Sequence, residues 1–194
     1  YYLETILIMS LTLYKPNSKN SGCAFSFRIG VNKKYEPTLY VSAIQQFSWD
    51  AGKRSGSFSG NRDNPDKNIN IKFNEFEAGG ILSAFANRNE YSTFHSFEEN
   101  KTSIKFTPWD KQVKVQDKTI TVPAFGAVFT RNGNQTFRIP LEPGEVQALT
   151  EFLRFYLNEL YKHRRREEIK NHKNKKNESG ATNTKPTNSD DAPF

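Results

Sequence analysis

Apolar and polar residues alternate along several short segments of the first half of the chain, which is the pattern of half-buried β-strands. The clearest segment is Cys23–Val31, where Phe25, Phe27 and Ile29 fall on one face and Arg28 falls on the other. The same alternation predicts strands at Leu11–Lys15, Thr38–Trp49 and Asn68–Phe73.

The segment Thr38–Trp49 would form an unusually long strand. Its alternation places Phe47 and Trp49 on the same face as its earlier apolar residues, with the Trp49 ring half exposed at the end of the strand. Residues 51–67 are rich in Gly, Ser, Asn, Asp and basic residues, which predicts a long flexible hairpin loop.

A helix is predicted over Glu75–Ala86, with Asn74 as its N-cap and acidic residues in its first turn, where the helix dipole favours them. Gly79 and Gly80 weaken this helix on its own but would permit close packing on a sheet. Its expected buried stripe consists of Phe76, Ile81, Leu82 and Phe85.

The second half of the chain repeats the order of strands followed by a helix. Strands are predicted at Tyr91–Phe97, Thr102–Trp109, Thr119–Arg131 and Gln135–Leu141. Asn132-Gly133 is a strong hairpin signal between the last two. Apolar residues at three- and four-residue steps then predict a helix from Pro143 to Tyr161, followed by a charged run to Lys176. From Asn177 onward the composition is typical of a disordered tail.

The pattern therefore predicts an α+β fold of two antiparallel four-stranded sheets, each followed by a helix, with a disordered C-terminal tail. The net charge of +7 makes an acidic partner such as nucleic acid the natural expectation. Residues 162–194 hold nine Lys or Arg and five acids, a net +4, so residues 1–161 hold only +3 (nineteen minus sixteen). Any nucleic-acid face on the body must then be a local patch.

Candidate chemistry other than binding is scarce in this sequence. Cys23 is the only cysteine and the three histidines are scattered, so no metal site and no cofactor are predicted. Catalytic signatures such as a phosphate loop, a dinucleotide fingerprint, a zincin helix or a nucleophile elbow do not occur, and we predict that the protein is not an enzyme. No apolar run reaches the length of a membrane span, so no membrane partner is expected.

The C-terminal residues 189–194 form a short acidic tip that ends in Pro193-Phe194, after a tail of Asn, Lys, Thr and Ser. This tip resembles that of bacterial single-stranded-DNA-binding proteins, in which it docks replication and repair enzymes. Asp190, Asp191 and the terminal carboxylate suit a basic pocket, and the Phe194 ring suits an apolar slot beside it.

The order of four strands and a helix, repeated, resembles the Whirly family of single-stranded-DNA-binding proteins over residues 11–161. The likeness is carried by Ile71–Leu82, by Phe137–Leu141 leading into the last helix, and by Gln46–Trp49 before a basic loop. The family's Lys-Gly-Lys-Ala-Ala-Leu-Ser signature is not intact: Tyr14-Lys15 resembles its start but is followed by Pro16 and Asn17, and only Ala24-Phe25-Ser26 resembles its end. The resemblance implies two roughly perpendicular sheets with helices packed across them, and a homo-oligomer, most simply a ring-like tetramer.

Binding a single strand without sequence preference needs cations for the phosphates and flat rings for the bases, and both are interleaved along this body. Instead of contacting DNA, an aromatic ring could be buried in the core, and a lysine could be an ordinary solvated surface charge. The predicted DNA-binding residues are Tyr14, Lys15, Lys19, Arg28, Lys33, Lys34, Trp49, Lys53, Arg54, Phe58, Tyr91, Lys101, Lys105, Trp109 and Lys111.

Four parts of the chain are therefore expected: an extension (1–10), a single-stranded-DNA-binding domain (11–161), a basic helix end with a linker (162–188), and the docking tip (189–194). The basic run Lys162–Arg166 is interpreted as a nucleic-acid arm, as a site that holds the tip when DNA is absent, or as a solvated helix end. The combined resemblances imply a bacteriophage protein that acts in the cytoplasm of an infected bacterium.

The leading hypothesis is a protein that coats single-stranded DNA during replication, recombination or repair and recruits enzymes through the tip. An RNA-binding or transcription-regulating module of the same fold, with the tip incidental, is the alternative. A self-assembling structural protein is a third.

Overall fold

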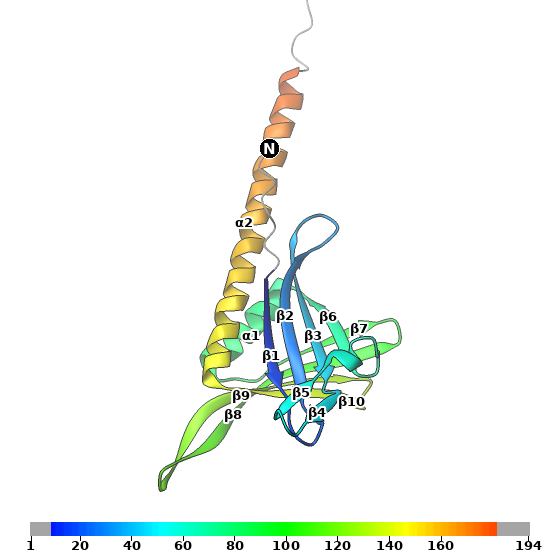
Figure 1. Cartoon of the computed structure of the whole chain (residues 1–194). Coiled ribbons are helices and arrows are strands. Elements are labelled where there is room, and N and C mark those ends of the chain that lie inside the picture. Colours follow the sequence, from blue (N-terminus) through cyan, green and yellow to red (C-terminus); the bar gives the residue numbers. More distant parts are fainter. Residues whose placement is uncertain (1–8, 182–194) are drawn as a thin grey trace, which may run out of the picture.

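A computed structural model describes residues 9–181, and their side chains as far as Lys176. Two four-stranded antiparallel sheets pack face to face, with their strands running in different directions (Figure 1). The first sheet has the order β1-β2-β3-β6, with β1 (Met9–Lys15), β2 (Cys23–Val31), β3 (Pro37–Gln45) and β6 (Asn68–Phe73). The second has the order β10-β9-β8-β7, with β7 (Tyr91–Phe97), β8 (Asn100–Val115), β9 (Lys118–Arg131) and β10 (Gln135–Leu141).

Each sheet is followed by a helix, α1 (Glu75–Asn87) and α2 (Pro143–Ala181), as the sequence predicts. The predicted fold class is confirmed. β1 begins at Met9, two residues earlier than predicted, and the hairpin between β9 and β10 has Asn132 and Gly133 at φ of 52° and 74°, the left-handed conformation that this turn requires.

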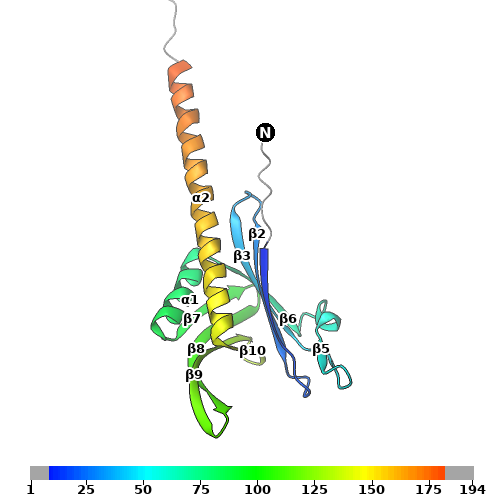
Figure 2. The ribbon, with the colours of Figure 1, turned by 60° about the vertical axis from the view of Figure 1, so that its left-hand side comes forward.

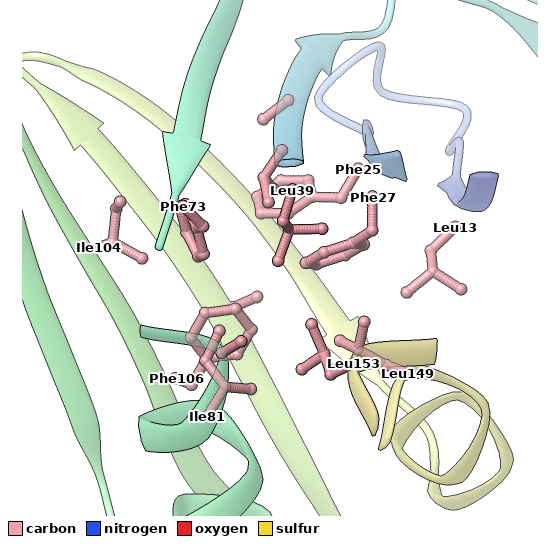
Figure 3. Close-up of a cluster of buried hydrophobic side chains, with 14 of the residues drawn as sticks. Leu13, Phe25, Phe27, Leu39, Phe73, Ile81, Ile104, Phe106, Leu149 and Leu153 are labelled. Carbon is pink, nitrogen blue, oxygen red and sulfur yellow. The ribbon is translucent and has the colours of Figure 1, made fainter. Parts of the chain in front are cut away.

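The core lies between the inward faces of the two sheets and is closed by both helices (Figure 3). The Phe25 and Phe129 rings lie 4.8 Å apart across the sheets, and Phe73 stacks on Phe129 at 6.2 Å. Ile81 of α1 and Leu153 of α2 are fully buried beside them. Burying each such side chain stabilises the fold by about 1.5–3 kcal/mol, so the alternation read from the sequence also identifies what holds the sheets together.

The long strand predicted at Thr38–Trp49 is wrong, because the chain breaks after β3 and forms the separate short strand β4 (Ser48–Asp50). The cause is Gln46, whose buried side chain accepts a hydrogen bond from the Asn17 backbone N–H and donates to the Asn17 carbonyl. This change of direction leaves Phe47 57% exposed instead of inward.

The predicted flexible loop at 51–67 is also corrected, because it contains β5 (Ser55–Ser57), which pairs with β4, and the short helix η1 (Ser59–Asn61). Asn61 is buried and donates hydrogen bonds to the carbonyls of Gln45 and Gln46. These bonds satisfy backbone groups that β3 leaves unpaired where it ends, and they fix the loop against the first sheet.

Helix α1 begins at the predicted cap, since the Asn74 side chain accepts from the Glu77 backbone N–H and the Glu77 carboxylate accepts from the Asn74 backbone N–H. The predicted burial of Phe76 is wrong: its ring is 81% exposed. Gly80 packs against Tyr91 of β7, where an added Cβ would lie 2.2 Å from the ring, whereas Gly79 has nothing within 4 Å.

Strands β8 and β9 are longer than predicted and extend beyond their neighbours as a two-stranded ribbon (Figures 1 and 2). The sequence showed the alternation only as far as Trp109 on the first of these strands. The polar residues that follow still pair with β9, because a hairpin with both faces in water needs no buried face.

Helix α2 packs on the body as far as Leu160 and then projects away from it to Ala181 (Figure 2). The disorder predicted from Asn177 is therefore wrong for residues 177–181, and the rest of the tail lies outside the described residues. Among the residues described, no helix is long and apolar enough to cross a membrane.

Arg164 fastens α2 to the body where the helix leaves it. Its guanidinium donates to Glu36, in the turn between β2 and β3, and to Glu75 at the start of α1, each at 2.8 Å. These hydrogen bonds hold the pKa of both carboxyl groups below their usual value.

Candidate nucleic-acid interface

The outer face of the first sheet is polar and is built from three rows of side chains that cross all four strands. One row joins Ser10, Arg28, Tyr40 and Lys72; the next joins Thr12, Ser26, Ser42 and Asn70; the third joins Tyr14, Ala24, Ile44 and Asn68. The middle row carries only hydroxyl and amide groups, and Thr12 and Ser26 hydrogen-bond to each other within it.

Aromatic rings flank this polar centre on both sides. Tyr14 is 62% exposed, and its ring centroid lies 5.7 Å from that of Phe58, which follows β5. On the far side of the middle row, the Arg28 guanidinium lies over the Tyr40 ring at 5.2 Å. The rings thus stand on either side of a strip of small polar side chains, where flat bases can stack and their edges can be hydrogen-bonded.

A groove of about 230 Å³ runs along this face, between the sheet and the loop that follows β5. Its floor is made by small side chains such as Thr12, Ser26 and Ser42, and its wall by Phe58 and Arg62. Since Asn61 ties this loop to the end of β3, the wall of the groove is held by hydrogen bonds of the fold itself.

The charge on this face has a single sign. Arg28 and Lys72 lie in the first row and Arg62 at the groove wall, all three exposed, and none of the twelve side chains in the three rows is acidic. Cations without nearby carboxylates remain available to phosphate groups. We define the three rows together with Phe58 and Arg62 as the sheet-1 face.

The structure brings only part of the predicted DNA-binding set together there. Tyr14, Arg28 and Phe58 belong to the sheet-1 face. Trp49, Lys53 and Arg54 lie on the β4–β5 hairpin, which contacts the same end of the sheet through Gly56 and Pro16. Lys19 is exposed in the β1–β2 loop, and Lys33 and Lys34 are exposed in the turn at the other end of the sheet.

The remaining predicted residues lie away from that face, and several have partners. Lys15 pairs with Glu145 and Lys111 with Glu142, each at 2.6 Å, and Lys105 pairs with Glu90 at 3.4 Å. Tyr91 is half-buried under α1, and this burial raises the pKa of its hydroxyl. Lys101 is exposed on β8, and Trp109 lies at the base of the β8–β9 ribbon.

Sequence reasoning missed Tyr40, Arg62, Lys72 and Asn70 as candidate site residues. Lys72 and Asn70 alternate with the buried Ile71 and Ile69, so their outward direction was legible in the sequence. What the sequence could not show is that β3 pairs with both β2 and β6, which puts Tyr40 between Arg28 and Lys72.

The described residues offer no obvious alternative chemistry. Within residues 9–181, no three His, Cys, Asp or Glu side chains gather so that they could hold a metal ion. Burial raises the pKa of the Cys23 thiol, which disfavours the nucleophilic thiolate.

No protein-family profile and no curated protein sequence matches this chain. The crystal structure of WHY1 from Arabidopsis thaliana is similar, with a TM-score of 0.53 and 16% identity over 88% of this chain and 95% of that one. The chain has a Whirly-like fold.

Two further solved structures resemble this Whirly-like chain. WHY3 from Arabidopsis thaliana has a TM-score of 0.47 and 15% identity over 79% of this chain and 88% of that one. The plant transcriptional regulator PBF-2 has a TM-score of 0.49 and 13% identity over 81% of this chain and 85% of that one. The docking tip, residues 189–194, lies outside the described part of the Whirly-like chain.

Proposed function

We propose that this protein binds single-stranded DNA without sequence preference along the sheet-1 face, and coats it during replication, recombination or repair. The observation that carries the proposal is that face itself: stacking rings on both sides of a polar strip, three exposed cations and no acidic residue in its three rows. The Whirly-like fold supports the same conclusion, since the Whirly proteins that the sequence resembles bind single-stranded DNA.

The expected energetics follow from the groups on that face. Each base stacked on Tyr14, Phe58 or Tyr40 contributes about 1–3 kcal/mol, and any base can take part because every base has a flat face. Arg28 and Lys72 would each displace a counterion from a phosphate, so the affinity should fall as salt rises, with a slope of about −0.7 per neutralised phosphate.

Recruitment is the second half of the proposed function. Asp190, Asp191 and Phe194 form an acidic, partly apolar peptide that suits a basic pocket with an apolar slot. This supports docking of replication and repair enzymes of a bacterial host, the role of the similar tip in bacterial single-stranded-DNA-binding proteins. A bacteriophage protein working in the host cytoplasm would need such a tip to reach host enzymes.

The test of binding is fluorescence-anisotropy titration of a labelled dT oligonucleotide at two salt concentrations, with duplex DNA and matched RNA as competitors. We expect tight binding to the single strand and weak competition by duplex and RNA. Equal competition by RNA would instead favour an RNA-binding module, and no binding to any nucleic acid would refute the proposal.

Two variants locate the site. Lys72→Ala should weaken binding uniformly across sequences and reduce the salt slope by about 0.7. Lys114→Ala is the matched control: it also removes one exposed lysine from a strand, but from the polar side of the projecting ribbon. Equal effects of the two variants would show that general charge, and not the sheet-1 face, drives binding.

The tip is tested separately, with enzymes known to dock on bacterial tips of this kind. Phe194→Ala should abolish their binding while leaving the dT affinity unchanged, and a peptide of residues 189–194 should compete. Retained enzyme binding by the variant would refute recruitment without touching DNA binding.

A further inference from the structure

The β8–β9 ribbon presents a largely apolar face whose Trp109, Val115 and Ile120 side chains are exposed. From the pair Trp109–Ala124 to the pair Val115–Lys118, β8 and β9 pair only with each other among the described strands, because the pairing of β7 with β8 ends at Phe106 and that of β10 with β9 ends at Phe125. These seven residue pairs form a ribbon about 23 Å long at roughly 3.3 Å per residue. Figures 1 and 2 both show it projecting from the body.

The two faces of this ribbon differ in character. Alternation places the apolar side chains Trp109, Val113, Val115, Ile120, Val122 and Ala124 on one face, together with Lys111 and Lys118. The other face is polar and includes Gln112 and Thr121, which hydrogen-bond to each other at 3.1 Å. Trp109, Val115 and Ile120 are 39%, 49% and 45% exposed. An isolated two-stranded ribbon is marginal in water, and an exposed apolar stripe marks an interaction surface.

The ribbon is better suited to protein than to nucleic acid. Residues 109–124 hold three lysines and two aspartates, a net charge of only +1. Two of these charges are already paired at its base, Asp110 with Arg88 at 2.9 Å and Lys111 with Glu142 at 2.6 Å. These two ion pairs lie on opposite faces of the ribbon, since Lys111 shares the apolar face and Asp110 the polar face.

The same chain carries a groove that fits such a ribbon. It measures about 690 Å³ and lies between β1 and α2, with Met9, Leu11, Ala148, Phe152 and Phe155 as its apolar lining. Within residues 9–181, β1 is an edge strand, because β2 is its one sheet partner there. A ribbon strand placed along β1 would extend the first sheet, with its apolar side against the Phe152 and Phe155 rings.

The charges at the two surfaces are complementary. The tip of the ribbon carries Asp117 and Lys118, which have no ion pair in the part of the chain that the structure describes. The groove is rimmed by Glu151 and Arg154, which are exposed and pair with each other at 2.9 Å; Glu151 also accepts a hydrogen bond from Gln147. Such an exposed ion pair contributes little stability, so replacing it by the pairs Lys118–Glu151 and Asp117–Arg154 between two copies costs little free energy.

We propose that the ribbon of one copy docks in the β1–α2 groove of a second copy. Donor and acceptor are different surfaces, so the contact is head-to-tail and closes into a ring when the rotation between copies permits. Each protomer then gives one ribbon and receives one, which doubles the area buried per protomer. The inference refines the homo-oligomer expected for the coating function by naming its contact.

The test is the self-association of the full chain, measured by sedimentation and mass photometry over a range of concentrations. Ile120→Asp should weaken self-association at least about tenfold, because it puts a charge on the buried face. Lys118→Glu and Glu151→Lys should each weaken it, and the double variant should recover most of the loss. Lys114→Glu, on the polar face, is the control and should change nothing.

The proposal would be overturned if the double variant self-associates no more strongly than the two single variants. Unchanged self-association in Ile120→Asp, or a wild-type protein that is monomeric at every concentration, would also overturn it. The groove would then belong to another occupant, such as residues 1–8 or a different protein. Circular dichroism confirms folding of each variant, which is expected because the altered side chains are exposed.

Short dT oligonucleotides separate this inference from the proposed function. Ile120→Asp should bind an oligonucleotide that fits one protomer with the wild-type Kd, since the sheet-1 face is intact. If the wild-type protein binds no DNA but the Lys118→Glu, Glu151→Lys double variant recovers self-association, the proposed function is refuted and the ribbon contact stands. Intact DNA binding with no rescue would refute the ribbon contact alone.

Discussion

Two adjacent glycines in α1 test how this helix is packed, because they have the same backbone context and opposite surroundings. An alanine Cβ at position 80 would lie 2.2 Å from Cε2 of the Tyr91 ring, which no real contact allows. At position 79 an added Cβ would meet nothing within 4 Å. Gly79→Ala is therefore the matched control for Gly80→Ala.

The magnitudes follow from two opposing terms. Replacing a helix-interior glycine by alanine stabilises the helix by about 0.8–1.0 kcal/mol, and this gain applies at both positions. Position 80 also incurs the cost of moving the Tyr91 ring or α1, about 1–3 kcal/mol for an overpacked site. We expect Gly79→Ala to raise the free energy of unfolding by up to about 1 kcal/mol. The free energy of unfolding of Gly80→Ala should be lower than that of Gly79→Ala by about 1–3 kcal/mol.

Urea unfolding of the two variants measures this difference as a shift of the midpoint at constant m. A Tyr91→Ala background should remove most of the difference, because the ring that the new methyl group meets is then absent. Equal stabilities of the two variants in the wild-type background would refute the packing of α1 on β7 described above.

Three other predictions concern single contacts. Arg164→Met should lower stability by under about 1 kcal/mol for each exposed ion pair lost, with the loss confined to higher pH. Arg164 depresses the pKa of Glu36 and Glu75, so its contribution to stability is complete above the ordinary glutamate pKa of about 4.3 and disappears as pH falls through the depressed values. A stability difference between the wild type and Arg164→Met that stays constant from about pH 3 to 7 would contradict this. Burial raises the pKa of Tyr156 to about 12, so stability should fall as pH rises from about 10 to 12, and Tyr156→Phe should remove one tyrosine that ionises near pH 12 from an absorbance titration. Asn74→Ala should cost about 1 kcal/mol in urea unfolding through loss of the capping box, and an unchanged midpoint would contradict it.

Most of the fold could be predicted from the sequence, because the strand period of two residues and the helix period of about 3.6 residues both follow which side chains are buried. The alternation of Cys23–Val31, the cap at Asn74 and the hairpin at Asn132-Gly133 each depend on neighbouring residues alone, and each is confirmed. The misreading at Phe47 has a different origin. The break there depends on Gln46 bonding to Asn17, 29 residues away, which no local pattern reveals.

The candidate site was less predictable than the fold, for a related reason. A list of basic and aromatic residues does not show which cations are already paired within the protein, as Lys15 and Lys111 are. Nor does it show that Arg28 and Lys72, 44 positions apart in the sequence, end in one cross-strand row. The pairing order of the strands decides both, and it is a property of the whole chain.

The alternation of β1 also lets the two proposed surfaces operate together. Thr12 and Tyr14 point to the sheet-1 face, whereas Met9 and Leu11 point to the opposite side, toward α2 and the groove. A neighbour's ribbon lying along the free edge of β1 would extend the first sheet without covering those outward side chains. DNA on one protomer could then pass to the extended sheet of the next, so self-association should favour binding of long strands while leaving short ones unaffected.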